Sequence, residues 1–346
     1  MNLYWKLTKF FVCILAINFK FKIAPYKLFL VVTKKCNSRC KNCLIWTNEN
    51  NEELQDDDYE KLAKAFGHRL FWLNLSGGEP TDHRDLIKVI EIFIANCPNL
   101  TFINFTSNAL NPDELNRIIA HLENRKKFIF GINISLDGPE NMHDHLRGVK
   151  GNYSLAIKAI KRLSETRNIV WKASMTLFAE NQNLINETYN SIKQHIPNFK
   201  IKHFHLNYSF VSGHYYQNKK SIDVLQPEKL ELPKRFNRWR LTPTGIIESL
   251  YLRKLKQFII IKKTPISCSA LKHNIHIDDA GYLFPCTIWD KPLGNIKDYQ
   301  YDLNQLMQNS LVKETLQEIN LRKCPNCWSP CEAYPSIINH LSEVIC

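Results

Sequence analysis

The chain has 346 residues, which is enough for two domains or for one large α/β unit with a substantial core. Its hydrophobic fraction of 44% and charged fraction of 23% are those of an ordinary globular protein rather than of a low-complexity chain. The net charge of +13 favours acidic partners, namely nucleic acid, an anionic membrane surface or an acidic electron-donor protein. Because the basic residues are spread along the chain without an arginine-rich tail, we expect most of them to cover solvated helix faces and nucleic acid not to be the partner.

Residues 1–26 combine apolar residues, from Trp5 to Phe19, with the interrupting lysines Lys6, Lys9, Lys20 and Lys22. The uninterrupted apolar part is too short to span a bilayer. No small-residue cleavage site of a signal peptide follows it, so we expect a cytoplasmic protein. This segment should pack on the exterior of the fold, with peripheral membrane contact as the alternative.

Three cysteines, Cys36, Cys40 and Cys43, follow an apolar strand expected at residues 28–32. Thiolates select zinc, copper(I) or iron–sulfur clusters. A closed structural site needs four protein ligands, whereas three leave one position open for a substrate or cofactor. A half zinc site completed from elsewhere in the chain remains an alternative. Disulfides are disfavoured because the cysteines cluster in metal-like spacings.

The spacing C-x3-C-x2-C resembles the signature of the radical S-adenosylmethionine (SAM) enzymes. The resemblance implies that Cys36, Cys40 and Cys43 hold a [4Fe-4S] cluster with one iron left for SAM. One electron then cleaves SAM, and a 5′-deoxyadenosyl radical abstracts hydrogen from a substrate. Many members place an aromatic residue just before the third cysteine, where this chain has Asn42, so the adenine contact stays unassigned.

The same resemblance implies reduced flavodoxin or ferredoxin as the electron donor. Basic residues surround the cysteine loop and form a candidate docking site for such an acidic protein. They are Lys34, Lys35, Arg39 and Lys41.

A second motif closes the next βα unit. After a helix that starts near residue 55, the strand at residues 70–75 ends in Ser76-Gly77-Gly78-Glu79-Pro80. Two glycines at a strand's carboxyl end let a ligand approach the backbone closely. One unit after the cysteines, Gly77, Gly78, Glu79 and Pro80 are similar to the family's GGEP motif, which contacts the methionyl amine of SAM.

Two more strand ends carry polar residues. A helix at residues 85–95 precedes a strand at 100–106 that leads to Asn108, and a helix opened by Pro112 precedes a strand at 128–134. The segments that follow are similar to an S-x-D-G segment and an R-G pair of the family, which meet the ribose and carboxylate of SAM. On that resemblance the candidates are Ser135, Asp137 and Arg147, together with Asn108. A plain turn is the alternative for Asp137 and Gly138.

A helix at 153–164, a strand at 169–177, a helix at 184–196 and a strand at 201–210 complete about six βα units. Such units make a parallel sheet whose ligands sit at the carboxyl ends of the strands. The predicted fold class is α/β: an open, partial (β/α)6 TIM-like barrel, as the resemblance implies, with a small C-terminal cysteine-rich α+β extension. We divide the chain into an N-terminal segment (1–26), the barrel (27–212), a helical connector (213–264) and the extension (265–346).

Three histidines close to the last barrel strand are further candidates. His203 and His205 should point to the same face of that strand because side chains alternate along it. With His214 they would either line the substrate cavity or make ordinary polar contacts.

The extension contains a hairpin at residues 275–286 with its turn at 279–281. The order of its cysteines resembles the SPASM and twitch extensions of radical SAM enzymes, which carry auxiliary iron–sulfur clusters. Six thiols cannot form two four-cysteine sites, so we expect one auxiliary [4Fe-4S] cluster, with a zinc knuckle as the alternative. The first choice of ligands is Cys268, Cys286, Cys327 and Cys331, followed by Cys324 and, last, Cys346.

These motifs together predict a radical SAM enzyme, with a peptide or protein as the expected substrate. Sulfatase-maturing relatives place an aspartate directly after the hairpin cysteine, whereas this chain has Thr287, so oxidation of a seryl or cysteinyl side chain by that route is disfavoured. A radical SAM enzyme acting on a small metabolite or a lipid-like substrate is one alternative. A basic zinc or iron–sulfur protein that binds nucleic acid is the non-enzymatic alternative.

Overall fold

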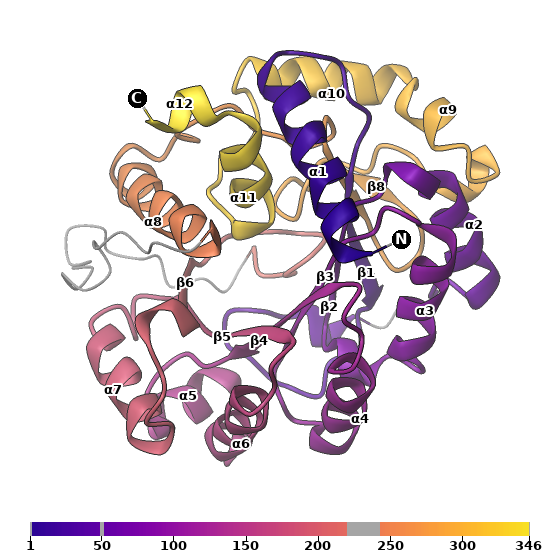
Figure 1. Ribbon diagram of the computed structural model, residues 1–346. Coiled ribbons are helices and arrows are strands. Elements are labelled where there is room, and N and C mark those ends of the chain that lie inside the picture. The colour runs from indigo at the N-terminus through magenta and orange to yellow at the C-terminus, as the bar shows by residue number, and fades with distance from the viewer. Residues whose placement is uncertain (1, 49–51, 220–242, 346) are drawn as a thin grey trace.

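A computed structural model describes residues 2–48, 52–219 and 243–345. Its centre is one sheet in the order β6-β5-β4-β3-β2-β1-β7-β8, and every neighbouring pair is parallel except β7 with β8 (Figure 1). The strands are β1 Lys27–Thr33, β2 Trp72–Gly77, β3 Phe102–Ser107, β4 Ile129–Ser135, β5 Ile169–Leu177, β6 Phe204–Tyr208, β7 Asn274–Ile277 and β8 Leu283–Phe284. The predicted α/β fold, a partial barrel, is confirmed.

Helices between the strands surround the outer face of this sheet (Figure 1). They are α2 Asp56–Phe66, α3 Leu86–Asn96, α4 Pro112–Leu122, α6 Asn152–Ser164 and α7 Ile185–His195, with a short α5 Glu140–Arg147 beside α6. Residues at the helix N-termini determine where two of these helices begin. Asp58 accepts a hydrogen bond from the backbone amide of Gln55 (2.7 Å) at the start of α2, and Pro112 lies in the first turn of α4.

Burial alternates along the central strands, which separates an outer from an inner face. Leu73 and Leu75 of β2 are fully buried in the core under the helices, whereas Asn74 between them is only partly buried. The same alternation recurs on the neighbouring strands. The inner face therefore carries a row of partly accessible polar side chains: Asn74, Asn104, Asn133, Lys172 and Asn207.

One prediction for the last barrel strand is wrong. His203 belongs to a 3-10 turn, Ile201–His203, and β6 starts only at Phe204. His203 stacks on the outward-facing Trp171 with ring centroids 4.2 Å apart, while His205 lies on the inner face. The alternation argument fails here because it applies only where the chain is extended.

The C-terminal part continues the barrel. The predicted hairpin is formed by β7 and β8, and β7 pairs along β1 in parallel, with Leu28 opposite Ile275. The remaining helices lie around this edge: α8 Pro243–Ile261, α9 Leu303–Met307, α10 Ser310–Asn320, α11 Pro330–Asn339 and α12 Leu341–Ile345. The predicted ligand Cys346 and much of the predicted connector, 220–242, lie outside the described residues.

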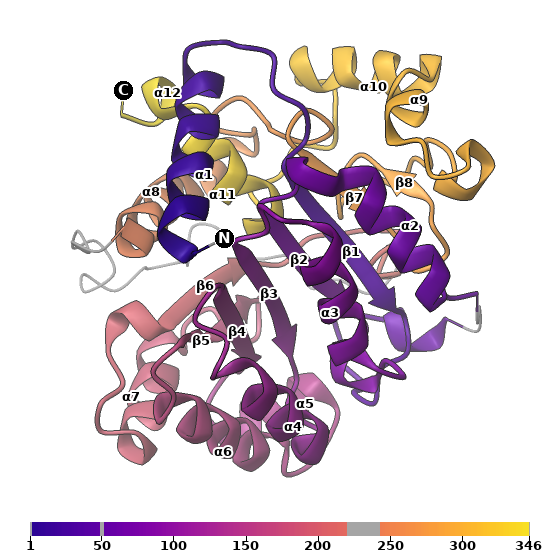
Figure 2. The same ribbon diagram turned by 45° about the vertical axis from the view of Figure 1, so that its right-hand side comes forward.

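The N-terminal segment forms helix α1, Leu3–Asn18, which packs on the exterior of the barrel as expected (Figure 2). It crosses the amino ends of the strands: Lys6 Nζ donates to the Leu100 carbonyl (2.8 Å), and Asn18 Nδ2 donates to the Ile338 carbonyl of α11 (2.9 Å). Among the described residues, none of the helices combines the length and hydrophobicity that crossing a bilayer requires.

Candidate active site

The cysteine loop follows β1 at the carboxyl edge of the sheet, where two neighbouring segments hold its backbone. On one side, the amides of Gly78 and Glu79 donate to the carbonyls of Thr33 (2.8 Å) and Lys35 (2.9 Å). On the other side, the amides of Arg39 and Lys41 donate to the carbonyls at the end of α5 (3.1 and 3.0 Å). The loop that carries the three thiols is therefore shaped by main-chain contacts to two distant parts of the chain.

Close packing against this loop explains the glycines of the predicted motifs. A Cβ atom on Gly78 would lie 2.1 Å from the Lys35 carbonyl oxygen, and one on Gly148 would lie 2.3 Å from that of Arg39. Gly77 adopts a φ of +151°, and its Cβ would lie 2.1 Å from the Thr33 oxygen. We expected these glycines to admit a ligand; in the structure the cysteine loop itself comes this close.

Polar side chains next to Cys36 join two of the predicted motifs. Asn108 Nδ2 lies 3.8 Å from Cys36 Sγ and donates to Asn37 Oδ1 (2.8 Å). Glu79 is 1% exposed, and its carboxylate accepts hydrogen bonds from the backbone amide of Asn108 (2.7 Å) and from Thr81 Oγ1 (2.8 Å). Glu79 is thus a structural link, and its pKa is raised by burial despite these hydrogen bonds.

A second group of predicted residues surrounds Cys40. Arg147 Nη1 lies 3.8 Å from Cys40 Sγ, and Arg147 Nη2 forms an ion pair with Asp137 Oδ2 (2.7 Å). Asp137 also accepts from the Thr176 amide (2.8 Å), and its own amide donates to His143 Nδ1 (3.0 Å). Burial favours the neutral form of Arg147, but the charges of Asp137 and Cys40 outweigh it and raise its pKa.

Ser135 and Pro80 complete the predicted set without direct contact to the thiols. Ser135 is 8% exposed at the end of β4, next to the segment of Asp137, and Pro80 is buried directly after Glu79. Every predicted SAM-binding residue therefore lies at one edge of the sheet, around the cysteine loop.

The three thiols interact electrostatically with one another. Burial and the neighbouring Cys40 raise the pKa of Cys36 to about 12, although a hydrogen bond from the Ser38 backbone lowers it. Burial, with Cys40 and Cys36 nearby, raises the pKa of Cys43 to about 12 as well. Such thiols are protonated until a cation replaces the proton. In the parts of the chain that the structure describes, no three His, Cys, Asp or Glu side chains converge on a single metal ion. A [4Fe-4S] cube instead takes one thiolate on each of three irons, which suits three thiols on one short loop.

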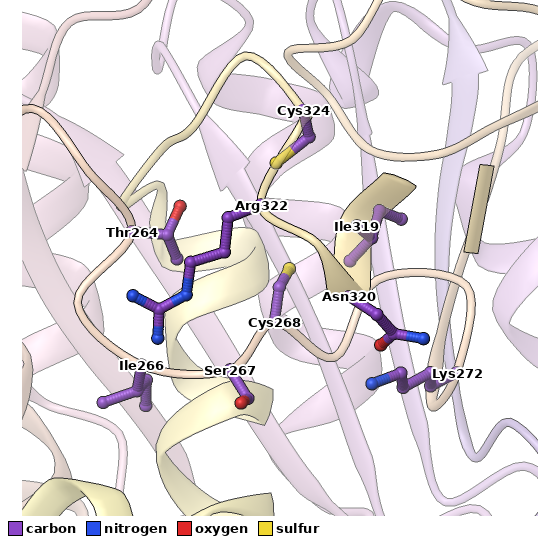
Figure 3. Close-up of a pocket in the computed structure, with 9 residues that line it drawn as sticks. All are labelled: Thr264, Ile266, Ser267, Cys268, Lys272, Ile319, Asn320, Arg322 and Cys324. Atoms are coloured by element: carbon purple, nitrogen blue, oxygen red, sulfur yellow. The ribbon is translucent and has the colours of Figure 1, made fainter. Parts of the chain in front are cut away.

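Four C-terminal cysteines come together in a second place. Cys268, Cys286, Cys324 and Cys327 line one small cavity with Ile288, Trp289 and Ile319. In Figure 3, which shows the adjoining pocket, the thiols of Cys268 and Cys324 project toward one another from two loops. Burial raises the pKa of Cys268 to about 12 and raises those of Cys286 and Cys327 well above their usual value. Four thiols that line one cavity supply the number of protein ligands that a closed cluster site needs.

Cys331 does not line that cavity. Its side chain packs beside Phe29, Val31 and Tyr215, on the inner side of β1, and Lys27 donates to its carbonyl oxygen (2.5 Å). The structure thus groups Cys324, rather than Cys331, with the other three cysteines. The reason is that Cys331 already belongs to the first turn of α11, which points back into the barrel.

A polar cluster on the inner face was not foreseen. Glu248 of α8, 1% exposed, accepts from Lys172 Nζ (2.5 Å) and Tyr334 OH (2.7 Å), and its other oxygen lies 2.9 Å from His205 Nδ1. A lone lysine inside the apolar strand at 169–177 was the available sequence signal. His214, the third candidate histidine, stacks on Phe284 (4.1 Å between ring centroids).

The predicted docking site for an electron donor needs one correction. Lys34 is only 14% exposed and forms ion pairs with Asp278 (3.1 Å) and Asp279 (2.7 Å), so it is not available to a partner. Lys41 is half exposed and lies 3.5 Å from Glu180, and Arg39 is exposed beside the loop.

Comparisons with known proteins show what this chain is similar to. The profile of the Radical SAM superfamily matches residues 30–192. Two similar proteins come from Bacillus subtilis (strain 168). The sporulation killing factor maturation protein SkfB is 29% identical over 79% of this chain and 62% of that protein. The antilisterial bacteriocin subtilosin biosynthesis protein AlbA is 23% identical over 88% of this chain and 64% of that protein. The chain thus spans just under two thirds of the length of these relatives.

Solved structures share the fold. Native anSMEcpe with bound AdoMet matches with a TM-score of 0.57 and 16% identity over 93% of this chain and 97% of that one. Streptococcus suis SuiB bound to S-adenosylmethionine matches with a TM-score of 0.56 and 16% identity over 87% and 70%. At these identities the likeness is one of architecture.

Proposed function

Because the profile of the Radical SAM superfamily matches residues 30–192, we propose that this chain is an enzyme that reductively cleaves SAM and uses the 5′-deoxyadenosyl radical to abstract hydrogen from a substrate. The observation that carries the proposal is the cysteine loop itself: three thiols interact on one loop at the carboxyl edge of a parallel sheet, with the SAM candidates around them. Cys36, Cys40 and Cys43 would hold the cluster, which supplies the electron when bound.

The chain's own residues would position SAM. Arg147 is a largely buried cation, with its side chain 14% exposed, that is fixed by Asp137, and its buried Nε atom has no hydrogen-bond acceptor among the described residues. A buried guanidinium with an unsatisfied donor favours an anionic partner, and the carboxylate of SAM fits. Asp137 then acts by orienting Arg147, and Glu79 acts by holding Asn108 at Cys36. Ser135 would offer its hydroxyl group to the same ligand, whereas Gly77 and Gly78 would act by shaping the cysteine loop that packs against them.

For the auxiliary cluster we propose Cys268, Cys286, Cys324 and Cys327 as ligands. Their shared cavity and mutual electrostatic interactions support this set over the one that includes Cys331. One [4Fe-4S] cluster with four protein ligands would be closed to substrate, in contrast to the N-terminal site.

The substrate that fits best is a peptide or protein. The relatives include a maturation protein of a killing factor and a biosynthesis protein of a bacteriocin, and a solved structure shows SuiB bound to the precursor peptide SuiA. The inner face of the barrel carries the amide side chains of Asn74, Asn104 and Asn133. Asn104 donates to Asn74 (2.5 Å) and accepts from Trp72 (2.5 Å), so the free groups of Asn74 and Asn133 are the ones that can pair with a peptide backbone. The same polar row disfavours a lipid-like substrate.

We also propose that reduction comes from flavodoxin or ferredoxin in the cytoplasm, with Lys35, Arg39 and Lys41 as the contact. The exposure of Arg39 and Lys41 beside the cysteine loop supports this.

Anaerobic iron and sulfide analysis together with product analysis tests the proposal. Wild-type protein should contain about eight irons and form 5′-deoxyadenosine from SAM and dithionite. The Cys36→Ala/Cys40→Ala/Cys43→Ala variant should retain about four irons and form none. Zinc in place of iron, or 5′-deoxyadenosine from the variant, would reject the assignment. Transfer of deuterium from labelled candidate peptides into 5′-deoxyadenosine then tests the substrate class.

A further inference from the structure

The outward side of α1 is an unusual surface. Large apolar side chains at helical spacing point away from the barrel, and the chain after the helix continues them: Tyr4 (79% exposed), Trp5 (52%), Phe11 (61%), Val12 (58%), Leu15 (37%), Phe19 (75%) and Phe21 (66%). We call these residues the α1 face. Isolated exposed apolar residues are normal on soluble proteins, but a contiguous group dominated by aromatic rings indicates a binding surface.

The helix cannot bury this face by turning over, because its opposite side is already fixed. Ile14 and Ile17 are buried, and the ring of Phe10 packs against Tyr26 (5.6 Å between centroids) and Phe102 (5.1 Å). Lys6 is buried on the same side and donates to the Leu100 carbonyl. The α1 face is therefore presented outward by a docked helix.

Charge selects the kind of partner. The sequence contains no aspartate or glutamate before Glu49, whereas Lys9, Lys20 and Lys22 accompany the aromatic residues, and Lys20 and Lys22 are exposed. Two copies of such a basic surface repel each other, so the face does not suit a homodimer. Aromatic and aliphatic side chains flanked by lysines suit the headgroup region of an anionic bilayer, where the rings enter the boundary and the ammonium groups meet lipid phosphates.

We infer that the α1 face is a peripheral membrane-binding surface specific for anionic lipids. Helix α1 lies across the amino ends of the strands, and the cysteine loop lies at their carboxyl ends, so a bound membrane would leave the active site accessible (Figure 2). This inference is independent of the reaction that the enzyme catalyses.

Co-sedimentation of the full-length protein with lipid vesicles tests it. Wild type should bind vesicles of phosphatidylcholine containing phosphatidylglycerol and should bind pure phosphatidylcholine at least about tenfold more weakly, with a loss of binding at high salt. Trp5→Ser/Phe11→Ser/Phe19→Ser should reduce binding at least about tenfold, since three buried side chains are removed from the interface. Lys20→Glu/Lys22→Glu should remove the preference for the anionic lipid.

A matched control replaces exposed apolar residues elsewhere. Val170→Ser/Leu321→Ser alters side chains that are 44% and 65% exposed on other elements and should bind like wild type. Quenching of wild-type tryptophan fluorescence by brominated lipids, lost in Trp5→Phe, gives a second measurement that needs no destabilising change. Absence of binding to anionic vesicles, equal binding by the aromatic variant, or preferential binding of single-stranded RNA by the same residues would overturn the inference.

Discussion

The two cysteine regions are built in opposite ways. In the N-terminal region, Cys36, Cys40 and Cys43 come from eight consecutive residues, and the rest of the barrel supplies the contacts that shape the loop. In the C-terminal region, four cysteines come from three separate segments and meet in a cavity with apolar walls.

This difference separates two chemical roles. A short loop can supply three thiolates and still leave one side of a cluster open, so its neighbours must provide the polar groups that receive a ligand there. Arg147 and Asn108 stand beside the thiols in that way. Four thiols around a cavity lined by Ile288 and Ile319 enclose their site instead. Under the proposed function, substrate chemistry would take place at the first region, and the second would have a structural or electron-transfer role.

The largest expected effect concerns which cysteines enclose the second site. Cys324→Ser should remove the auxiliary cluster and leave about four irons, whereas Cys331→Ser should retain about eight, because Cys331 lies outside the cavity. Anaerobic iron and sulfide analysis measures both. Loss of iron in Cys331→Ser with retention in Cys324→Ser would contradict the ligand set proposed for the C-terminal region.

The shape of the N-terminal cysteine loop can be changed by a substitution that leaves all three thiols in place. Gly78→Ala places a Cβ 2.1 Å from the Lys35 carbonyl oxygen, so the loop must move and the catalytic cluster should be lost, with SAM cleavage reduced at least about a hundredfold, equivalent to about 2.7 kcal/mol in the barrier. Auxiliary iron should remain.

Gly67→Ala is the control for this variant. Gly67, unlike Gly78, has a positive φ (+49°), but no neighbouring atom lies within 4 Å of the position that a Cβ would take there, so only local backbone strain of about 1–3 kcal/mol is expected. If both glycine variants lose the same iron, the loop packing is not the cause.

An intermediate effect is expected for Arg147→Lys, which retains the charge but not the planar guanidinium that contacts both Asp137 and Cys40. SAM affinity should fall about tenfold to a hundredfold while iron content stays unchanged, as measured by equilibrium binding under anaerobic conditions. An unchanged affinity for SAM would remove Arg147 from the binding site and leave it a structural role only.

The smallest effect concerns pH and applies to both regions. Burial, with Arg147 nearby, lowers the pKa of His143 to about 4, and burial lowers that of His276, beside the second region, well below its usual value. Unfolding restores ordinary pKa values near 6.5, so the unfolded chain binds more protons below that pH. The free energy of unfolding should be fully retained above about pH 6.5 and should fall as the pH drops toward 4, by at most about 1.4 kcal/mol per pH unit for each histidine.

Urea unfolding of the cluster-loaded protein between pH 7.5 and 5.5 measures the slope of the free energy of unfolding against pH. His143→Gln and His276→Gln should each make it shallower. A slope that neither substitution changes would assign the acid sensitivity to other groups.

The features that could be predicted from the sequence are those that depend on residues close to one another along the chain. The cysteine loop, the glycines and the strand ends could be predicted because they are recognised from short spacings in the sequence and from the alternation of strands and helices. The grouping of Cys324 with Cys268 could not, because it depends on how three loops meet. The Glu248 cluster was missed for the same reason, since its members come from β5, β6, α8 and α11. His203 was misassigned because a 3-10 turn delays the strand.

The pairing of β7 with β1 has a mechanical consequence. β1 ends in the loop of Cys36, and β7 leads through the hairpin to Cys286, so one hydrogen-bonded ladder connects the two cysteine regions that would hold the proposed clusters. A ladder of this kind resists sliding and hinging, so the spacing between two inorganic centres is set when the chain folds rather than when a ligand arrives. An electron moving between them would travel a path of constant length through every turnover.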